Sequence, residues 1–154
     1  LTQVDLWECR HQSPHQLSGG QKQRLAIASA LAVEAEVLIL DEALSMLDPQ
    51  GKKEVTALLR ELHREGMTIL SVTHDLDEAW EADHVLFLAQ GRLIAQGHPR
   101  QVLRDTSLLK RHGLKPPFVV EAAQALKEGG LPFPVWPNSL PELVEVIWSS
   151  LRKD

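Results

Sequence analysis

Two apolar runs, with a helical pattern between them, organise the first half of the chain. Residues 37–40 read Val-Leu-Ile-Leu, which is typical of a central strand in a parallel sheet. Residues 67–73 predict a second strand. Between the two, residues 50–65 predict a helix that ends at Gly66 as its C-cap. The apolar stripe of this helix consists of Val55, Leu58, Leu59 and Leu62. The order strand, helix, strand predicts a parallel crossover unit and an α/β fold.

The second half of the chain alternates a hairpin with short helices. Two apolar runs within residues 84–97 flank Gln90 and Gly91, a pattern that predicts a β-hairpin. Ser139, with Glu142 three residues later, predicts a capping box at the start of a last helix. The other expected helices cover residues 1–9, 76–82, 99–105, 106–112 and 118–128. The apolar stripe of the last helix comprises Leu140, Leu143, Val144, Ile147 and Leu151.

A Ser-Gly-Gly-Gln turn precedes a helix expected over residues 20–33. Ser18 is a strong N-cap, because its hydroxyl accepts a bond from a free amide one turn on. Gly19 and Gly20 have no side chains, so an anion could approach the backbone near the positive end of the helix dipole. The turn predicts a phosphate contact through Ser18, the glycine amides and Gln21, with an ordinary capped turn as the alternative. Lys22 and Arg24 are expected on the solvated face of this helix, with a contact to phosphate or to acidic residues as the alternative.

Acidic and imidazole side chains follow the two predicted strands. Asp41 and Glu42 lie at the C-terminal end of the first strand, the edge at which open α/β sheets bind ligands. Neighbouring carboxylates there suit the binding of Mg²⁺ through water, or the orientation of an attacking water. His74 follows the second strand and could donate a hydrogen bond to a γ-phosphate. Solvated carboxylates and a structural histidine are the alternatives at these positions.

The joint order of these motifs resembles that of the ABC-transporter ATPases. The run LSGGQKQRLAIASAL (17–31) is similar to their signature motif, and VLILDE (37–42) is similar to their Walker B strand. SMLD resembles their D-loop and SVTHD their H-loop. The resemblance covers about residues 10–97 and implies a P-loop NTPase fold, a parallel sheet with flanking helices. One departure is Leu44, where the family usually has threonine.

The resemblance implies a role for each matched residue. Asp41 would serve Mg²⁺, Glu42 would be the catalytic base, and His74 would contact the γ-phosphate of ATP. Asp48 would act across a dimer interface. A second group of residues would contact ATP that is bound mainly by a partner subunit, namely Ser18, Gly19, Gly20 and Gln21.

The amino-acid composition limits the functional classes to which this chain can belong. The chain has 154 residues, of which 44% are hydrophobic and 24% charged, as in a globular protein with one sizeable core. Its net charge is −5 and it has no block of lysine and arginine, so we expect no nucleic-acid partner. Cys9 is the only cysteine, which suits a reducing compartment. No apolar run approaches about 18 residues, so no membrane-spanning helix is predicted.

The C-terminal segment narrows the resemblance to one subfamily. LLKRHGLKPPFVVEAAQAL, residues 108–126, resembles the C-terminal extension of the energy-coupling factor ATPases of cobalt and vitamin transporters. We therefore expect residues 1–97 to be the C-terminal part of an ABC ATPase domain and residues 98–154 to be a helical extension. In that subfamily the extension helps to pair two ATPase subunits. Packing of the last helix on its own domain is the alternative.

The resemblance implies a peripheral ATPase on the cytoplasmic face of the cell membrane, which powers uptake of a vitamin or a metal ion. Its partners would be a second ATPase subunit, identical or paralogous, a membrane-embedded coupling subunit and a substrate-binding subunit. Two alternatives are a non-catalytic module that contributes the signature half of another ATPase's site, and a soluble ABC ATPase without a transporter.

One motif of such a site is absent from the sequence. No G-x-x-x-x-G-K-[ST] loop, the Walker A motif that cradles phosphates, occurs in the 154 residues. We therefore expect this loop upstream, and the chain to be the C-terminal part of a longer protein.

Overall fold

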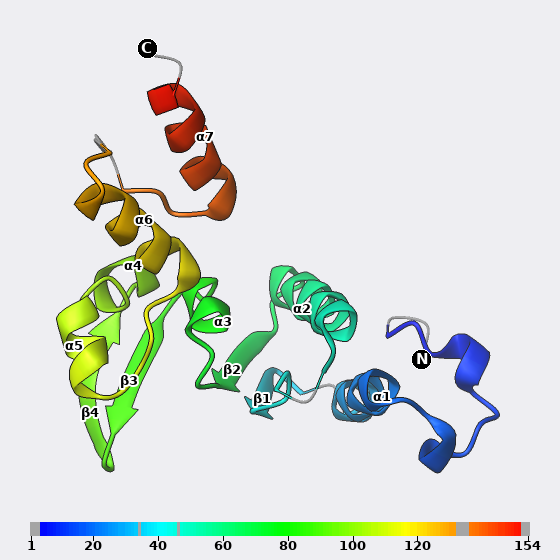
Figure 1. Cartoon of the computed structure of the whole chain (residues 1–154). Coiled ribbons are helices and arrows are strands. Elements are labelled where there is room, and N and C mark those ends of the chain that lie inside the picture. The colour runs from blue at the N-terminus through cyan, green and yellow to red at the C-terminus, as the bar shows by residue number, and fades with distance from the viewer. Residues whose placement is uncertain (1–3, 34, 46, 132–135, 152–154) are drawn as a thin grey trace. The chain divides into compact units, whose positions relative to one another are not determined.

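The structure is a computed structural model that describes residues 4–33, 35–45, 47–131 and 136–151 (Figure 1). Its contacts divide the chain into two compact units, Leu1–His74 and Asp75–Asp154. Each unit has a hydrophobic core of its own. The expected domain boundary at residue 97 stays a prediction. Along the described ranges, no helix is long and apolar enough to cross a lipid bilayer.

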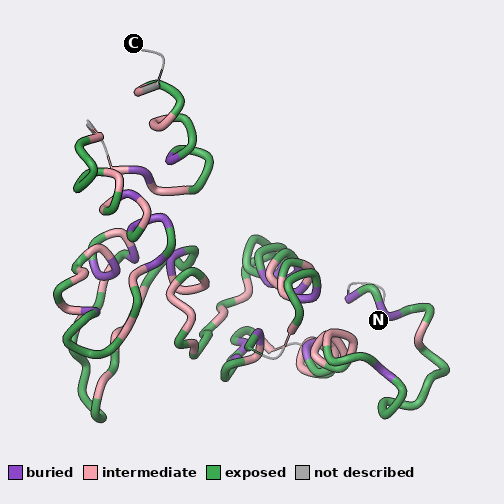
Figure 2. Tube along the Cα trace, in the orientation of Figure 1, coloured by how far each residue is buried: buried purple, intermediate pink, exposed green. Residues whose placement is uncertain are grey.

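The first unit is built on a parallel pair of strands. Among the described residues, its α-helices and β-strands are α1 (Gly19–Leu31), β1 (Val37–Asp41), α2 (Pro49–Arg64) and β2 (Thr68–Val72), preceded by two short 3₁₀ helices at Trp7–Cys9 and Pro14–Gln16. β1 pairs with β2 in parallel, in a register that sets Val37 opposite Thr68 and Asp41 opposite Val72. The apolar stripe of α2 is buried throughout, and buried and exposed positions alternate along this helix in Figure 2. The predicted strand–helix–strand unit is therefore confirmed.

The strand β1 buries one face and exposes the other. Leu38 and Leu40 belong to the core of the first unit, together with Ile27 of α1. Val37 and Ile39, which point to the opposite face, are 50% and 64% exposed. A central strand of a parallel sheet, which this apolar run predicts, is usually buried on both faces. In the first unit the core takes only alternate residues from β1.

The segment before α1 is not the amphipathic helix expected over residues 1–9, of which the first three lie outside the described part. The rest forms a turn followed by a 3₁₀ helix at Trp7–Cys9. Asp5 has a φ of 53°, in the left-handed region, so a regular helix cannot run through it. Val4 and Leu6 are nevertheless buried, as apolar anchors on the core of the first unit.

The second unit combines an antiparallel hairpin with helices. Its elements are α3 (Leu76–Trp80), β3 (Val85–Ala89), β4 (Arg92–Gly97), α4 (Pro99–Val102), α5 (Thr106–Arg111), α6 (Phe118–Glu128) and α7 (Leu140–Leu151). β3 and β4 pair antiparallel. Gln90 and Gly91 between them have φ values of 50° and 71°, the turn geometry that matches the twist of hairpin strands. The predicted hairpin is confirmed.

Helix α7 buries only part of its predicted stripe. Leu143 is 4% exposed and belongs to the core of the second unit, and Ile147 packs against that core. Leu140 and Val144 are 51% and 49% exposed. The side chain of Leu151 lies outside the described part. The helix therefore contacts its unit along a narrower stripe than the sequence predicts, because α6 is the main element that meets it.

The start of α7 is capped by a variant of the predicted capping box. Ser139 Oγ accepts the N–H of Glu142 at 3.3 Å, as predicted. The Glu142 carboxylate, however, accepts the backbone and side-chain N–H groups of Asn138, at 2.8 and 3.2 Å. Trp80 Nε1 donates to the Asn138 carbonyl at 2.8 Å, and Arg104 donates to Asn138 Oδ1 at 3.0 Å. Asn138 thus joins the start of α7 to α3 and to the segment after α4.

This cap makes stability depend on pH. The backbone N–H of Asn138 is the main reason that the pKa of Glu142 lies below its usual value. A carboxyl with a lowered pKa in the folded state stabilises the fold above its unfolded pKa, and the contribution is lost as the pH falls through the folded pKa. We expect Glu142→Gln to lower the melting temperature near neutral pH, and the difference to vanish well below pH ~4, the ordinary range of glutamate.

Melting curves recorded across this pH range measure the effect. Glu145→Gln, which changes an exposed carboxyl on the same helix, is the matched control and should leave the melting temperature nearly unchanged. A difference between the parent and Glu142→Gln that stays constant down to the acid end of the range would contradict the assignment.

Candidate functional site

The C-terminal ends of β1 and β2 bring a predicted carboxylate to the predicted histidine. Glu42 Oε1 lies 3.1 Å from His74 Nδ1, although the residues are 32 positions apart. The parallel pairing of the strands causes this contact, because both strands end at the same edge. The two side chains are 53% and 70% exposed. A ligand at this edge can therefore reach the carboxylate and the imidazole together.

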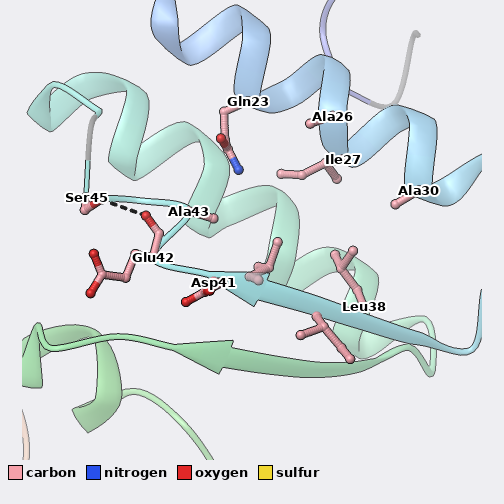
Figure 3. A pocket seen from close by; sticks show the side chains of 11 residues that line it. Gln23, Ala26, Ile27, Ala30, Leu38, Asp41, Glu42, Ala43 and Ser45 are labelled. Carbon is pink, nitrogen blue, oxygen red and sulfur yellow. Dashed lines mark hydrogen bonds between the residues drawn. The ribbon is translucent and has the colours of Figure 1, made fainter.

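Glu42 has a backbone conformation that is rare for residues other than glycine. Its φ is 47°, in the left-handed region. Its N–H donates to the carbonyl of Val72 at 2.8 Å, and its own carbonyl accepts from the amide and the hydroxyl of Ser45, at 3.1 and 2.7 Å (Figure 3). These bonds hold the residue in a strained form. Strain of this kind is concentrated at functional sites, where it fixes the direction of a side chain.

A hollow of about 440 Å³ adjoins the end of β1 (Figure 3). Its polar atoms come from Asp41, Glu42 and Ser45, and from Gln23 on α1. Its apolar lining includes Ala26, Ile27, Ala30, Leu38 and Ile39. Gln23 is a lining residue that was not predicted from the sequence. Its spacing from Ile27, four positions along the same helix, was the available signal that it faces this hollow.

Ser18 caps α1, as predicted. Its Oγ accepts the N–H of Gln21 at 3.2 Å, and Gln21 Oε1 accepts the N–H of Ser18 at 2.9 Å. A Cβ placed on Gly19 would meet no described atom within 4 Å, whereas a Cβ on Gly20 would lie 3.9 Å from the Cα of Gly51. The helix end is therefore open on the Gly19 side, where an anion could approach the amides. The phosphate contact itself stays a prediction.

The side chain of Gln21 has a second partner that sequence reasoning missed. Its Nε2 donates to Cys9 Sγ at 3.3 Å, and Cys9 is half-buried. Both ends of the Gln21 amide are therefore engaged within the first unit. A phosphate contact of this side chain would exchange one of these bonds. No local pattern could have indicated the pair, because Cys9 lies 12 positions earlier.

Asp48 caps α2 at the loop that resembles a D-loop. Its Oδ1 accepts the N–H of Gly51 at 3.1 Å. Gly51 is buried, and a Cβ there would lie 2.7 Å from Asp48 Oδ1, so a side chain would displace the cap. Leu44, which stands where the family usually has threonine, is 4% exposed and belongs to the core. The action of Asp48 across a dimer interface stays a prediction.

The expected solvated position is confirmed for Lys22, whereas Arg24 takes the alternative, a contact with an acidic residue. Lys22 is exposed. The Arg24 side chain is only 15% exposed, and its Nη1 lies 2.8 Å from Glu54 Oε2 on α2. Helical spacing within α1 could not indicate this ion pair, because its acidic partner belongs to another helix.

The carboxylates at the end of β1 suit a magnesium ion that also binds phosphates. Mg²⁺ usually keeps several waters and takes one or two carboxylates together with phosphate oxygens of the substrate. Asp41 and Glu42 are both exposed at this edge. Within the described ranges, no group of three or more histidine, cysteine, aspartate or glutamate side chains is gathered to hold a metal by itself. The donors present therefore fit a magnesium–phosphate site.

Known proteins similar to this chain include ABC transporter ATPases. A family model described as ABC transporter matches residues 1–45. The energy-coupling factor transporter ATP-binding protein EcfA1 of Geobacillus kaustophilus is 45% identical over 154 residues, which cover 99% of this chain and 55% of that protein. The chain spans about half the length of the curated relatives it matches.

Solved structures lead to the same family. The cbiO1 protein from Clostridium perfringens, described as part of the ABC transporter complex cbiONQ, has a TM-score of 0.64 and 36% identity, over 80% of this chain and 50% of that one. An ATP-binding cassette in a dimeric post-hydrolysis state, bound to ADP and Pi, has a TM-score of 0.57 and 33% identity, over 64% of this chain and 44% of that one. The predicted α/β fold of P-loop NTPases is thereby confirmed. The chain is therefore similar, over nearly its whole length, to the C-terminal half of the energy-coupling factor transporter ATP-binding proteins, and its first 45 residues match the ABC transporter family model.

Proposed function

We propose that this chain forms the C-terminal half of an ATP-binding and ATP-hydrolysing subunit of an energy-coupling factor importer. The observation that carries the proposal is the contact of 3.1 Å between Glu42 and His74 at the end of the parallel strands. A carboxylate and an imidazole at this edge can orient a water and a terminal phosphate. The similarity to ABC transporter ATPases supports the same reaction.

Each residue at the strand ends has a distinct proposed role. Glu42 accepts a proton from the water that attacks the γ-phosphate of ATP, and His74 donates a hydrogen bond to that phosphate. Asp41 holds Mg²⁺, which when bound neutralises charge on the phosphates. The phosphate-cradling loop is supplied from outside these 154 residues, since they contain no G-x-x-x-x-G-K-[ST] motif. The exposed apolar face of β1, at Val37 and Ile39, offers that part of the domain a surface to cover.

The signature turn serves the ATP of a second subunit in this proposal. The turn and Asp48 lie at the N-terminal ends of α1 and α2, where backbone amides can meet phosphates. ATP that bridges two subunits would close the dimer, and hydrolysis would release it. The dimeric state of a solved relative with ADP and Pi supports two subunits. The turn consists of Ser18, Gly19, Gly20 and Gln21.

The proposal extends to transport. The partners are an identical or paralogous ATPase subunit, a membrane-embedded coupling subunit and a substrate-binding subunit, and the cargo is a vitamin or a metal ion. The subunit lies at the cytoplasmic face of the membrane, with residues 1–97 as the ATPase part and residues 98–154 as an extension that pairs subunits. The printed names of the relatives, energy-coupling factor transporter and ABC transporter complex, support this assignment.

The proposal is tested by measuring ATP hydrolysis by the complete protein, which is the full product of the gene that encodes this chain. We expect Mg²⁺-dependent release of phosphate from the complete protein, and none from the 154-residue chain alone, which has no phosphate-cradling motif. A folded complete protein that binds no ATP, or binds it without turnover, would overturn the proposal. It would favour a non-catalytic module that completes the site of another ATPase.

A further inference from the structure

The two helices α1 and α2 contact each other, and an ion pair joins them there. Arg24 Nη1 lies 2.8 Å from Glu54 Oε2, and the two side chains are 15% and 39% exposed. The other carboxylate oxygen of Glu54 accepts Gln50 Nε2 at 2.8 Å. Both oxygens of this carboxylate are therefore engaged, so its position relative to the two helices is well defined.

The guanidinium of Arg24 depends on this partner. Its Nε is buried and has no hydrogen-bond partner among the described residues. A second acid, Asp5, lies 3.9 Å from the same Nη1, but its side chain is 96% exposed, so water screens this pair. Glu54 is therefore the partner that sets the direction of Arg24.

A close approach of two glycines lies one helical turn before the ion pair. Gly20 precedes Arg24 by four positions, and Gly51 precedes Glu54 by three. A Cβ on Gly20 would lie 3.9 Å from the Cα of Gly51, so the first turns of α1 and α2 are in contact. The ion pair and the glycine contact thus join the same faces of the two helices at neighbouring levels.

The residues at the N-terminal ends of α1 and α2 are the ones that would contact a neighbouring subunit. Ser18 caps α1 and begins the signature turn, and Asp48 caps α2 in the loop that resembles a D-loop. We propose that Arg24 and Glu54 are positioning residues, which hold the signature turn and the loop of Asp48 in one rigid arrangement so that both meet a partner's nucleotide together. This inference rests on the proposed function. In this inference, neither the Arg24 side chain nor the Glu54 side chain touches the nucleotide.

The test uses the complete protein with Arg24→Met, with Glu54→Gln, and with the exchanged pair Arg24→Glu and Glu54→Arg. In each single variant we expect the ATP concentration for half-maximal hydrolysis to rise at least about fivefold, the lower end of typical coupling between sites. ATP affinity of the separated subunit should stay unchanged, because that binding does not use the signature turn. The exchanged pair should recover most of the parental ATP dependence, since the attraction is restored.

Control measurements distinguish a loss of positioning from a loss of protein stability. Glu61→Gln, at an exposed position of α2, should behave as the parent. Melting temperatures identify a variant that fails to fold. If another variant does not fold, the ATP dependence of the milder Glu54→Gln decides whether the inference holds. Parental ATP dependence in the folded single variants, with an active parent, would overturn this inference alone. A parent without hydrolysis would overturn the proposed function and this inference with it.

Discussion

Glu42→Gln in the complete protein is expected to abolish most ATP turnover while ATP binding remains. Glutamine has the shape of glutamate and can keep the contact with His74, which is 3.1 Å in the parent. It cannot accept a proton from the attacking water at neutral pH. We expect turnover to fall at least about a hundredfold, the lower range for loss of a general base. Phosphate release at saturating ATP measures the turnover, and nucleotide titration measures the binding.

The structure sharpens this expectation, because the backbone of Glu42 is held independently of its carboxylate. Its amide and carbonyl bonds to Val72 and Ser45 do not involve the side chain, so the amide variant should keep the same strand end. Dimer formation with ATP should persist in Glu42→Gln, since closure needs bound ATP rather than its hydrolysis. Glu36→Gln, at an exposed position just before β1, is the matched control. Near-parental turnover in Glu42→Gln would rule out Glu42 as the base.

Gly20→Asp is expected to block ATP-dependent dimerisation without unfolding the first unit. The added Cβ has room, at 3.9 Å from Gly51 Cα and 4.0 Å from Leu47 Cδ2. A carboxylate in the first turn of α1 is even favourable for the helix. Next to a phosphate, the same carboxylate is unfavourable. Two unit charges about 5 Å apart repel by roughly 3 kcal/mol at an effective dielectric constant near 20. Dimerisation should therefore weaken by about a hundredfold, measured by size-exclusion chromatography with ATP and the hydrolysis-deficient Glu42→Gln background.

Asparagine at the same position isolates the charge. Gly20→Asn adds nearly the same volume without a negative charge, so it should weaken dimerisation far less than Gly20→Asp does. The melting temperatures of both variants should match the parent within a few degrees, since neither creates a close contact. Equal dimerisation of Gly20→Asp and the parent would refute contact between this turn and a phosphate.

The local pattern of the sequence was sufficient for the elements that depend on local forces. The stripe of α2 predicted its buried face, because helical periodicity alone decides which side chains share a face. Ser18 and Gly66 predicted helix ends, because cap geometry involves only neighbouring residues. Gln90 and Gly91 predicted the hairpin turn for the same reason.

Contacts between distant residues were decided only in the tertiary structure. The strained conformation of Glu42 depends on the carbonyl of Val72, which parallel strand pairing brings into reach. The Arg24–Glu54 pair and the Cys9–Gln21 bond join elements whose separate patterns carry no sign of each other. The sequence alone thus determined the order of strands and helices and the residue types at the strand ends. The distances between these side chains, and the partners that they contact, were decided by packing, because a hydrogen bond or ion pair forms only where the fold brings two surfaces together.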